Sequence, residues 1–260
     1  DEIFISSACL TKIQIIMRFG MEVSNIAVFG SSGSLGNAFI KHFAVQYPEA
    51  VIYAFSRSEQ AFDNANVLSH SLNYQDEGAI EKAIIAATAK QPFDIVIVAT
   101  GVLHDDVVTP EKSLKQLSID TIRHYFDVDT ILPAMIAKHC LPRLNRENQV
   151  IFAVLSARVG SISDNQLGGW YGYRMAKSAL NMLIKTAAIE IRRSNKQAVI
   201  VGLHPGTVAS HLSAPFQRHV PEGKLFSPAY AVEQLVSVLS HLSPEQSGGF
   251  FAYDGQELTP

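Results

Sequence analysis

The feature that most constrains this chain is a series of short, continuous apolar runs that alternate with helical patterns from about residue 25 onward. Continuous runs are typical of strands that are covered on both faces. The strand candidates are 26–29, 51–55, a weaker run from 67, 94–99, 150–155, 198–203 and 250–253. The helix candidates are 37–46, 79–89, 119–139 with a bend near Pro133, 173–191 and 229–242. This alternation predicts a doubly wound α/β fold with a parallel, seven-stranded sheet.

The length and composition fit one domain. A chain of 260 residues, 47% of them hydrophobic, can bury a sizeable core. We find no internal repeat and no low-complexity linker, so we expect a single domain over residues 21–260. Residues 1–20 lack the basic and apolar regions of a signal peptide. We expect them to be an N-terminal extension of unclear role.

Charge and cysteine content argue against several other classes. The formal net charge is −3 and no long basic block occurs, so a nucleic-acid-binding surface is not indicated. No apolar run reaches the ~18 residues that span a bilayer. Cys9 and Cys140 show neither disulfide nor metal-ligand spacing, and the histidines form no HExxH motif. We therefore expect a cytoplasmic protein without a metal site or a membrane partner.

A glycine-rich loop joins the first strand candidate to the first helix candidate. It reads Gly30-Ser31-Ser32-Gly33-Ser34-Leu35-Gly36. A turn at this place directs free backbone N–H groups and the positive end of a helix at an anion, and glycines allow a pyrophosphate to approach. The alternative is a flexible surface turn. The position in the first strand–helix unit favours a dinucleotide-binding, Rossmann-type domain.

The end of the second strand candidate indicates which nucleotide binds. NAD-binding domains place an acidic residue there for the ribose 2′-hydroxyl. Here the strand ends with Ser56, Arg57 and Ser58, none of which is acidic. The Arg57 guanidinium suits a 2′-phosphate, although it could also be a solvated loop arginine. We therefore expect NADP(H) rather than NAD(H).

Tyr173 and Lys177 stand four residues apart in a helix candidate, so their side chains share one face. A phenol is protonated at neutral pH, and a nearby cation makes it a better acid. Such a tyrosine can protonate a carbonyl oxygen while hydride reaches the carbon. Because the spacing also arises by chance, the alternative is a partly buried tyrosine beside a surface lysine.

Five segments resemble the short-chain dehydrogenase/reductase family, and within it the carbonyl-reductase-like group that includes the C-factor and sniffer proteins. They are GSSGSLG at 30–36, ATGVLHD at 99–105, ARVGSI at 157–162, GGWYGYRMAKSALNML at 168–183 and HPGTVASHLSAPF at 204–216. The resemblance implies an NADPH-dependent oxidoreductase acting on a small carbonyl or alcohol substrate. It also implies a homodimer or homotetramer that packs helices 119–139 and 173–191.

The resemblance assigns roles to individual residues. Tyr173 falls on the catalytic tyrosine, and Lys177 on the lysine that holds the nicotinamide ribose. Thr207 and Val208 would offer backbone groups to the carboxamide. The remaining cofactor-binding candidates are Gly30, Ser32, Gly33, Ser34, Leu35, Gly36, Ser56, Arg57, Asn73, Thr100, Gly101, Pro205 and Gly206.

The chain departs from the family pattern at four places. Gly33 follows Gly30 by three residues rather than four, and Val98-Ala99-Thr100-Gly101 replaces Asn-Asn-Ala-Gly. Asp129 stands where the family has an asparagine that holds a water beside the lysine. The alternative for Asp129 is a solvent-facing carboxylate or one paired with a neighbour.

The fourth departure is Ala157, which stands where the family has its catalytic serine. Ser156 is the first candidate to replace that hydroxyl, provided that the strand has ended there, because adjacent strand residues face opposite ways. Ser161 is the second candidate, and the third alternative is that no serine acts. A rival function is therefore a nucleotide-binding regulatory or signalling protein with degraded catalysis.

Two pairs of flanking residues have open roles. Trp170 and Tyr171 either wall the substrate pocket or pack the start of the helix. His104 and Asp105 follow the fourth strand candidate, at an edge where such sheets bind ligands. They either line the substrate cleft or belong to a solvated loop.

Overall fold

The computed structural model describes residues 23–259 and contains a parallel seven-stranded sheet of order β3-β2-β1-β4-β5-β6-β9. The strands are β1 (Asn25–Phe29), β2 (Val51–Ser56), β3 (Val67–Ser71), β4 (Ile95–Val98), β5 (Val150–Leu155), β6 (Ala198–His204) and β9 (Phe250–Ala252). The doubly wound Rossmann-type fold predicted from the apolar runs is therefore confirmed. The extension expected at residues 1–20 lies outside the described residues.

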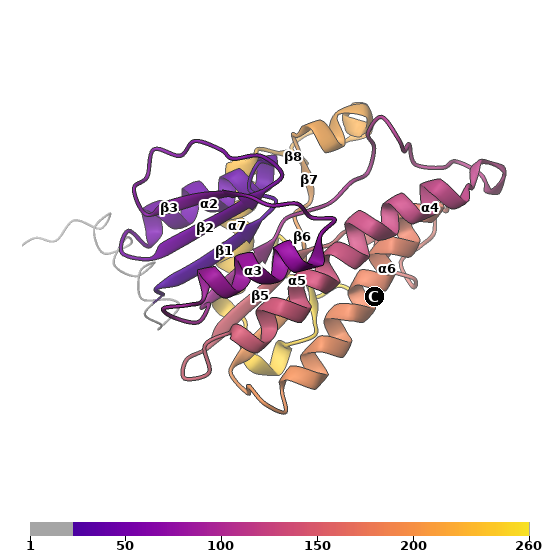
Figure 1. Cartoon of the computed structure of the whole chain (residues 1–260). Coiled ribbons are helices and arrows are strands. Elements are labelled where there is room, and N and C mark those ends of the chain that lie inside the picture. The colour runs from indigo at the N-terminus through magenta and orange to yellow at the C-terminus, as the bar shows by residue number, and fades with distance from the viewer. Residues whose placement is uncertain (1–22, 260) are drawn as a thin grey trace, which may run out of the picture.

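Helices cover both faces of the sheet, as Figure 1 shows. On one face lie α2 (Ser34–Gln46) and α7 (Pro228–His241), which pack on each other. On the other face lie α3 (Glu77–Ala87), α5 (Leu132–Cys140) and α6 (Tyr171–Ile191), with α4 (Ile119–Phe126) along α6. Within residues 23–259, no helix combines the length and the apolar character needed to cross a membrane.

The continuous apolar runs are explained by two cores. In β1, Ile26 and Val28 pack with α2 and α7, whereas Ala27 and Phe29 pack with the helices of the opposite face. All five residues of β1 are buried, because side chains alternate between two covered faces. Burying a large aliphatic or aromatic side chain contributes ~1.5–3 kcal/mol, so each central strand stabilises both layers.

The long helix expected over 119–139 is interrupted by a π-helical turn, Asp127–Ile131, between α4 and α5. Pro133 has no N–H to donate to the carbonyl of Asp129, four residues earlier. The Leu132 N–H instead bonds the Asp127 carbonyl, five residues earlier. Proline thus widens the turn that carries Asp129, and π-turns of this kind are frequent at functional sites.

One edge of the sheet collects the segments that matter for function. Because the strands are parallel, the loops after β1, β2, β4, β5 and β6 all leave the same edge. A short ribbon of β7 (Thr207–Val208) and β8 (Leu225–Phe226), with a 3₁₀ segment His211–His219 between them, adds to the loop after β6. This ribbon was not predicted, because two-residue strands carry no readable periodicity.

Candidate active site

The glycine loop is shaped by contacts that exclude side chains. Gly30 has φ +83°, and a Cβ there would lie 2.9 Å from the backbone of Ala99. At Gly36 a Cβ would lie 2.1 Å from the Gly30 carbonyl oxygen. Gly33 is the N-cap of α2 and offers no capping side chain to the first turn of that helix. The positive end of α2 is therefore available to an anion.

Tyr74 fixes this loop, and sequence reasoning missed it. Its hydroxyl accepts a hydrogen bond from the Gly30 N–H at 2.9 Å and donates one to the Phe55 carbonyl at 2.7 Å. It therefore ties the start of the loop to the end of β2. Burial raises the pKa of the Tyr74 hydroxyl well above its usual range, so it remains a donor. A tyrosine after the third strand carries no motif that would have revealed this role.

The residues after β2 and β3 lie side by side. Arg57 is exposed, and its backbone carbonyl accepts a hydrogen bond from Ser71. The Ser56 hydroxyl is buried and donates to the Ser58 carbonyl at 2.5 Å, while Asn73 accepts a hydrogen bond from the Gln75 N–H. Arg57 is therefore the exposed cation among these residues, whereas the side chains of Ser56 and Asn73 bond the backbone of their own loops.

The segment after β4 lies close to the Lys177 side chain of α6. A Cβ on Gly101 would lie 3.1 Å from Asp129 Oδ1 and 3.6 Å from Lys177 Nζ, so only glycine leaves that space open. The buried hydroxyls of Thr100 and Ser31 have no hydrogen-bonding partner among the described residues. A cradle without side chains beside two unpaired hydroxyls fits a bound dinucleotide.

The loop after β6 turns at Gly206, which has φ +73° and lies under Phe226 of β8. Pro205 precedes this turn, and Thr207 and Val208 form β7. Because β7 pairs with β8, the backbone of these residues is held at the carboxyl edge of the sheet. This is where the sequence prediction places the nicotinamide end of the cofactor.

Tyr173, Lys177 and Asp129 meet at the centre of this edge. Lys177 Nζ lies 3.1 Å from Asp129 Oδ1, 3.2 Å from the Leu155 carbonyl and 5.7 Å from the centroid of the Tyr173 ring. All three side chains are buried, with exposed fractions of 7%, 4% and 0%. The alternative that Asp129 faces solvent is therefore excluded. Lys177 retains a third N–H for a ligand.

The electrostatics of this cluster favour a protonated tyrosine. Burial, reinforced by the negative charge of Asp129, raises the pKa of Tyr173 well above its usual range. Burial also raises the pKa of Asp129, against the opposing effect of the Lys177 ammonium group. Among the described residues, none forms a hydrogen bond with the Tyr173 hydroxyl. The group is therefore a proton donor without an internal acceptor.

Neither candidate serine is directed at Tyr173. Ser156 continues the alternation of β5, and its buried hydroxyl donates to Asn181 Oδ1 of α6 at 2.7 Å. The Ser161 hydroxyl donates to the Thr259 carbonyl at 2.5 Å. Ala157 instead packs against the cluster that contains Tyr173. This geometry does not support the expectation that Ser156 supplies the missing hydroxyl. It favours the alternative that no serine acts.

Comparison with known proteins identifies the family. The model of the short chain dehydrogenase family matches residues 24–220. This chain belongs to the short-chain dehydrogenase family.

Two curated family members show moderate identity. The 1-hydroxy-2-glutathionyl-2-methyl-3-butene dehydrogenase of Rhodococcus sp. (strain AD45) is 32% identical over 166 residues, covering 64% of this chain and 68% of that protein. C-signal of Myxococcus xanthus is 32% identical over 133 residues, covering 51% of this chain and 75% of that protein. The predicted resemblance to the short-chain dehydrogenase/reductase family, and within it to the C-factor and sniffer group, is thereby confirmed.

Solved structures of family members share the fold. Carbonyl reductase Sniffer of D. melanogaster has a TM-score of 0.78 at 22% identity, and an NADPH-bound carbonyl reductase from chicken fatty liver has 0.79 at 20%. Each comparison covers 92% of this chain and all of the other chain. The chain is therefore an oxidoreductase of this family by sequence and fold.

Aromatic rings pack beside Tyr173. Trp170 lies edge-on to Tyr173 with centroids 6.3 Å apart, and Phe216 lies 5.0 Å from Trp170. His104 is 5.9 Å from Phe216, and its Nε2 donates to the His211 carbonyl at 2.9 Å. His104 and Trp170 thus belong to one group of rings beside Tyr173, whereas Asp105 pairs with His124 at 2.8 Å.

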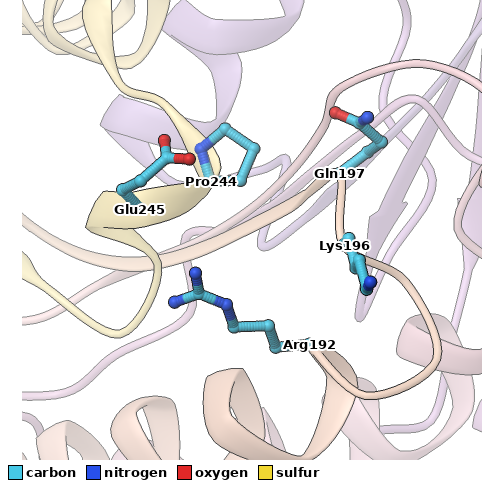
Figure 2. Close-up of a pocket in the computed structure, with 5 residues that line it drawn as sticks. All are labelled: Arg192, Lys196, Gln197, Pro244 and Glu245. Atoms are coloured by element: carbon cyan, nitrogen blue, oxygen red, sulfur yellow. The ribbon is translucent and has the colours of Figure 1, made fainter.

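A hollow in the surface lies away from this site. Arg192, Lys196, Gln197, Pro244 and Glu245 line it (Figure 2). Gln197 immediately precedes β6, so the hollow adjoins the amino ends of the strands. Open α/β sheets bind ligands at the opposite edge, where Tyr173 lies. The hollow is therefore separate from the candidate site.

The orientation of the serines generates a prediction. Adding a hydroxyl by Ala157→Ser should raise kcat for carbonyl reduction about tenfold, because one donor to a developing oxyanion contributes at least that much. Ser156→Ala should change kcat less than twofold beyond any effect on stability, and Ser161→Ala serves as its matched control. Steady-state kinetics on the three variants decide the matter. A large loss in Ser156→Ala with no gain in Ala157→Ser would contradict this account.

Proposed function

We propose that this protein catalyses NADPH-dependent reduction of a carbonyl group on a small molecule, and the reverse oxidation of the alcohol. The observation that carries the proposal is the buried Tyr173 side chain beside Lys177, whose hydroxyl has no hydrogen-bonding partner among the described residues and lies at the sheet edge that also holds the glycine cradle. Several solved relatives by fold are named as carbonyl reductases, and one is described as NADPH-bound. This likeness supports the proposal.

The residues of this chain would divide the work as follows. NADPH, when bound, supplies the hydride to the carbonyl carbon. Tyr173 donates its phenolic proton to the carbonyl oxygen, which becomes the hydroxyl of the alcohol product. Lys177 uses its remaining N–H to hold the nicotinamide ribose, while Asp129 and the Leu155 carbonyl fix its direction. The aromatic cover excludes water from the tyrosine.

The preference for NADPH rests on Arg57. Its side chain is exposed at the carboxyl end of β2, and its two neighbours, Ser56 and Ser58, are not acidic. A guanidinium group binds a phosphate through parallel charge-assisted hydrogen bonds, but gains little from a ribose hydroxyl. The 2′-phosphate of NADPH is therefore the feature that this edge recognises.

The nucleotide preference is tested by Arg57→Ala. Losing one charge-assisted contact should weaken NADPH binding about ten- to a hundredfold and leave NADH binding nearly unchanged. Isothermal titration of both nucleotides measures the effect, with Arg192→Ala as a control at the far edge of the sheet. Equal weakening of both nucleotides, or a wild-type preference for NADH, would show that Arg57 does not recognise the phosphate.

The proton donor is tested by Tyr173→Phe. This change should lower kcat by at least about a hundredfold and leave the Kd for NADPH nearly intact, because the phenol acts only on the reacting oxygen. Lys177→Ala should impair both quantities. Tyr230→Phe, an exposed position on α7, is the matched control. Near-normal kcat in Tyr173→Phe would refute the mechanism.

The role of Asp129 is tested through pH dependence. Asp129→Asn removes a negative charge that raises the pKa of Tyr173, so the tyrosine should ionise at lower pH. The basic limb of kcat/KM for alcohol oxidation should move down by about one pH unit. Asp127→Asn, on the exposed side of the same π-turn, should leave the profile unchanged. An unchanged or upward-shifted limb in Asp129→Asn would remove Asp129 from the proton chemistry.

A second function is favoured by one observation: the hydroxyls of Ser156 and Ser161 bond Asn181 and Thr259 instead of facing Tyr173. A nucleotide-binding regulatory protein would retain the cradle and lose turnover. Mixing the protein with NADPH and a panel of aldehydes and ketones separates the two functions. Loss of the reduced-nicotinamide absorbance supports the enzyme, whereas tight binding without turnover across the panel supports the regulatory protein.

A further inference from the structure

We propose that Trp170 determines substrate specificity by forming a fixed wall for a planar, aromatic group attached to the reacting carbonyl. This inference rests on the proposed function, because it needs a carbonyl at the Tyr173 hydroxyl. It goes further by assigning a residue and a chemical class of substrate.

The backbone of Trp170 is the first observation. Trp170 has φ +53°, and it is the one non-glycine residue with positive φ in the described range 23–259. Gly168 and Gly169 precede it with φ +64° and +67°, so three successive residues are left-handed. Large side chains avoid this conformation, and strained residues of this kind concentrate at functional sites. A glycine at 170 would meet the same turn without strain.

Two residues hold this strained segment in place. The Arg174 guanidinium donates hydrogen bonds to the carbonyls of Gly169, Val159 and Gly168, at 3.0, 3.1 and 3.3 Å. The backbone carbonyl of Glu111 accepts from the Trp170 N–H at 2.5 Å. The buried carboxylate of Glu111 accepts from the Gly172 N–H at 3.1 Å, at the first turn of α6. The backbone that carries the indole is therefore held on both sides of Trp170.

The direction of the indole is the third observation. Trp170 lies 6.3 Å from the Tyr173 ring and 5.0 Å from Phe216, so it belongs to the cover over the proposed proton donor. Ala157, Val159 and Leu212 are apolar side chains that pack against the cluster containing Tyr173, and His104 lies beside Phe216 at 5.9 Å. A group attached to the carbonyl would meet a surface that is apolar and edged by aromatic rings.

This surface selects for aromatic groups. A planar ring can adopt the offset or edge-to-face contacts that aromatic pairs prefer, and such pairs gain stability beyond simple burial of area. A saturated ring of the same size buries similar area without that gain. Charged groups would lose their hydration against Ala157 and Leu212 without gaining a partner there.

The test compares acetophenone with cyclohexyl methyl ketone, which have the same number of heavy atoms. The measured quantity is the ratio of their kcat/KM values, because comparing this ratio between variants cancels the intrinsic reactivity of the ketones. Trp170→Leu should lower the acetophenone preference about fivefold, mainly through KM, and Trp170→Phe should retain most of it. An unchanged ratio in Trp170→Leu overturns the inference.

Trp170→Gly separates specificity from folding. This variant removes the indole and its packing on Tyr173 and Phe216, but it relieves the left-handed strain, so the protein should still unfold in one cooperative urea transition. The kcat/KM ratio of acetophenone to cyclohexyl methyl ketone should still fall about fivefold. A stable Trp170→Gly protein with the wild-type ratio overturns the inference. Arg174→Lys, which cannot span three carbonyls, should also lower the ratio, and Arg192→Lys is its matched control.

A binding measurement gives a second readout. Trp170 is the sole tryptophan of the chain, so its fluorescence reports on this wall directly. Benzamide should quench it in the NADP⁺-loaded protein with a Kd about fivefold lower than that of cyclohexanecarboxamide. Equal affinities overturn the inference and leave the proposed function standing. Absence of NADPH oxidation across the panel of aldehydes and ketones overturns the proposed function, and the inference with it.

Discussion

The buried ion pair between Lys177 and Asp129 is the interaction on which the site depends. Taking two charges out of water is costly, and the cost is offset only when further hydrogen bonds satisfy both groups. Here the Leu155 carbonyl accepts from Lys177, and the Val102 N–H donates to Asp129 Oδ1, whereas the buried Oδ2 of Asp129 has no hydrogen-bonding partner among the described residues. The pair therefore joins the end of β5, the loop after β4, the π-turn and α6. Removing either partner would leave a buried charge without compensation.

The pair also sets the character of Tyr173. A free lysine beside a phenol favours the phenolate, but a lysine already neutralised by a carboxylate does so much less. Burial and Asp129 both act to keep the Tyr173 proton in place. A tyrosine in this state carries the proton that the proposed carbonyl reduction needs, and its raised pKa makes it a weaker acid than an ordinary phenol. The proposed reduction therefore starts from the phenol at neutral pH, whereas the proposed alcohol oxidation needs the phenolate.

The sequence predicted the fold well because its signals are local and repeated. Continuous apolar runs such as Ile26–Phe29 follow directly from a sheet with two buried faces. The Tyr173–Lys177 pair was predictable because helix geometry fixes residues four apart on one face. The proline that widens the turn at Asp129 was visible in sequence, but its outcome was expected as a bend.

Other features depend on contacts between distant segments. The direction of Ser156 depends on whether the alternation of β5 continues past Leu155, and α6 provides the Asn181 partner that decides it. Tyr74 reaches the glycine loop across 44 residues of sequence. Arg174 holds the segment before Trp170 and also donates a hydrogen bond to the carbonyl of Val159, which lies in another loop. None of these contacts has a spacing that a single sequence reveals.

The most direct test of this account is the ionisation of Tyr173 itself. Protein labelled with ¹³C at tyrosine Cζ can be titrated by NMR, and a Tyr173→Phe sample identifies the resonance. The account predicts that the Tyr173 resonance remains that of a phenol beyond pH 10, the ordinary pKa of tyrosine. A resonance that changes to the phenolate form near neutral pH would contradict the central role given to the Lys177–Asp129 pair.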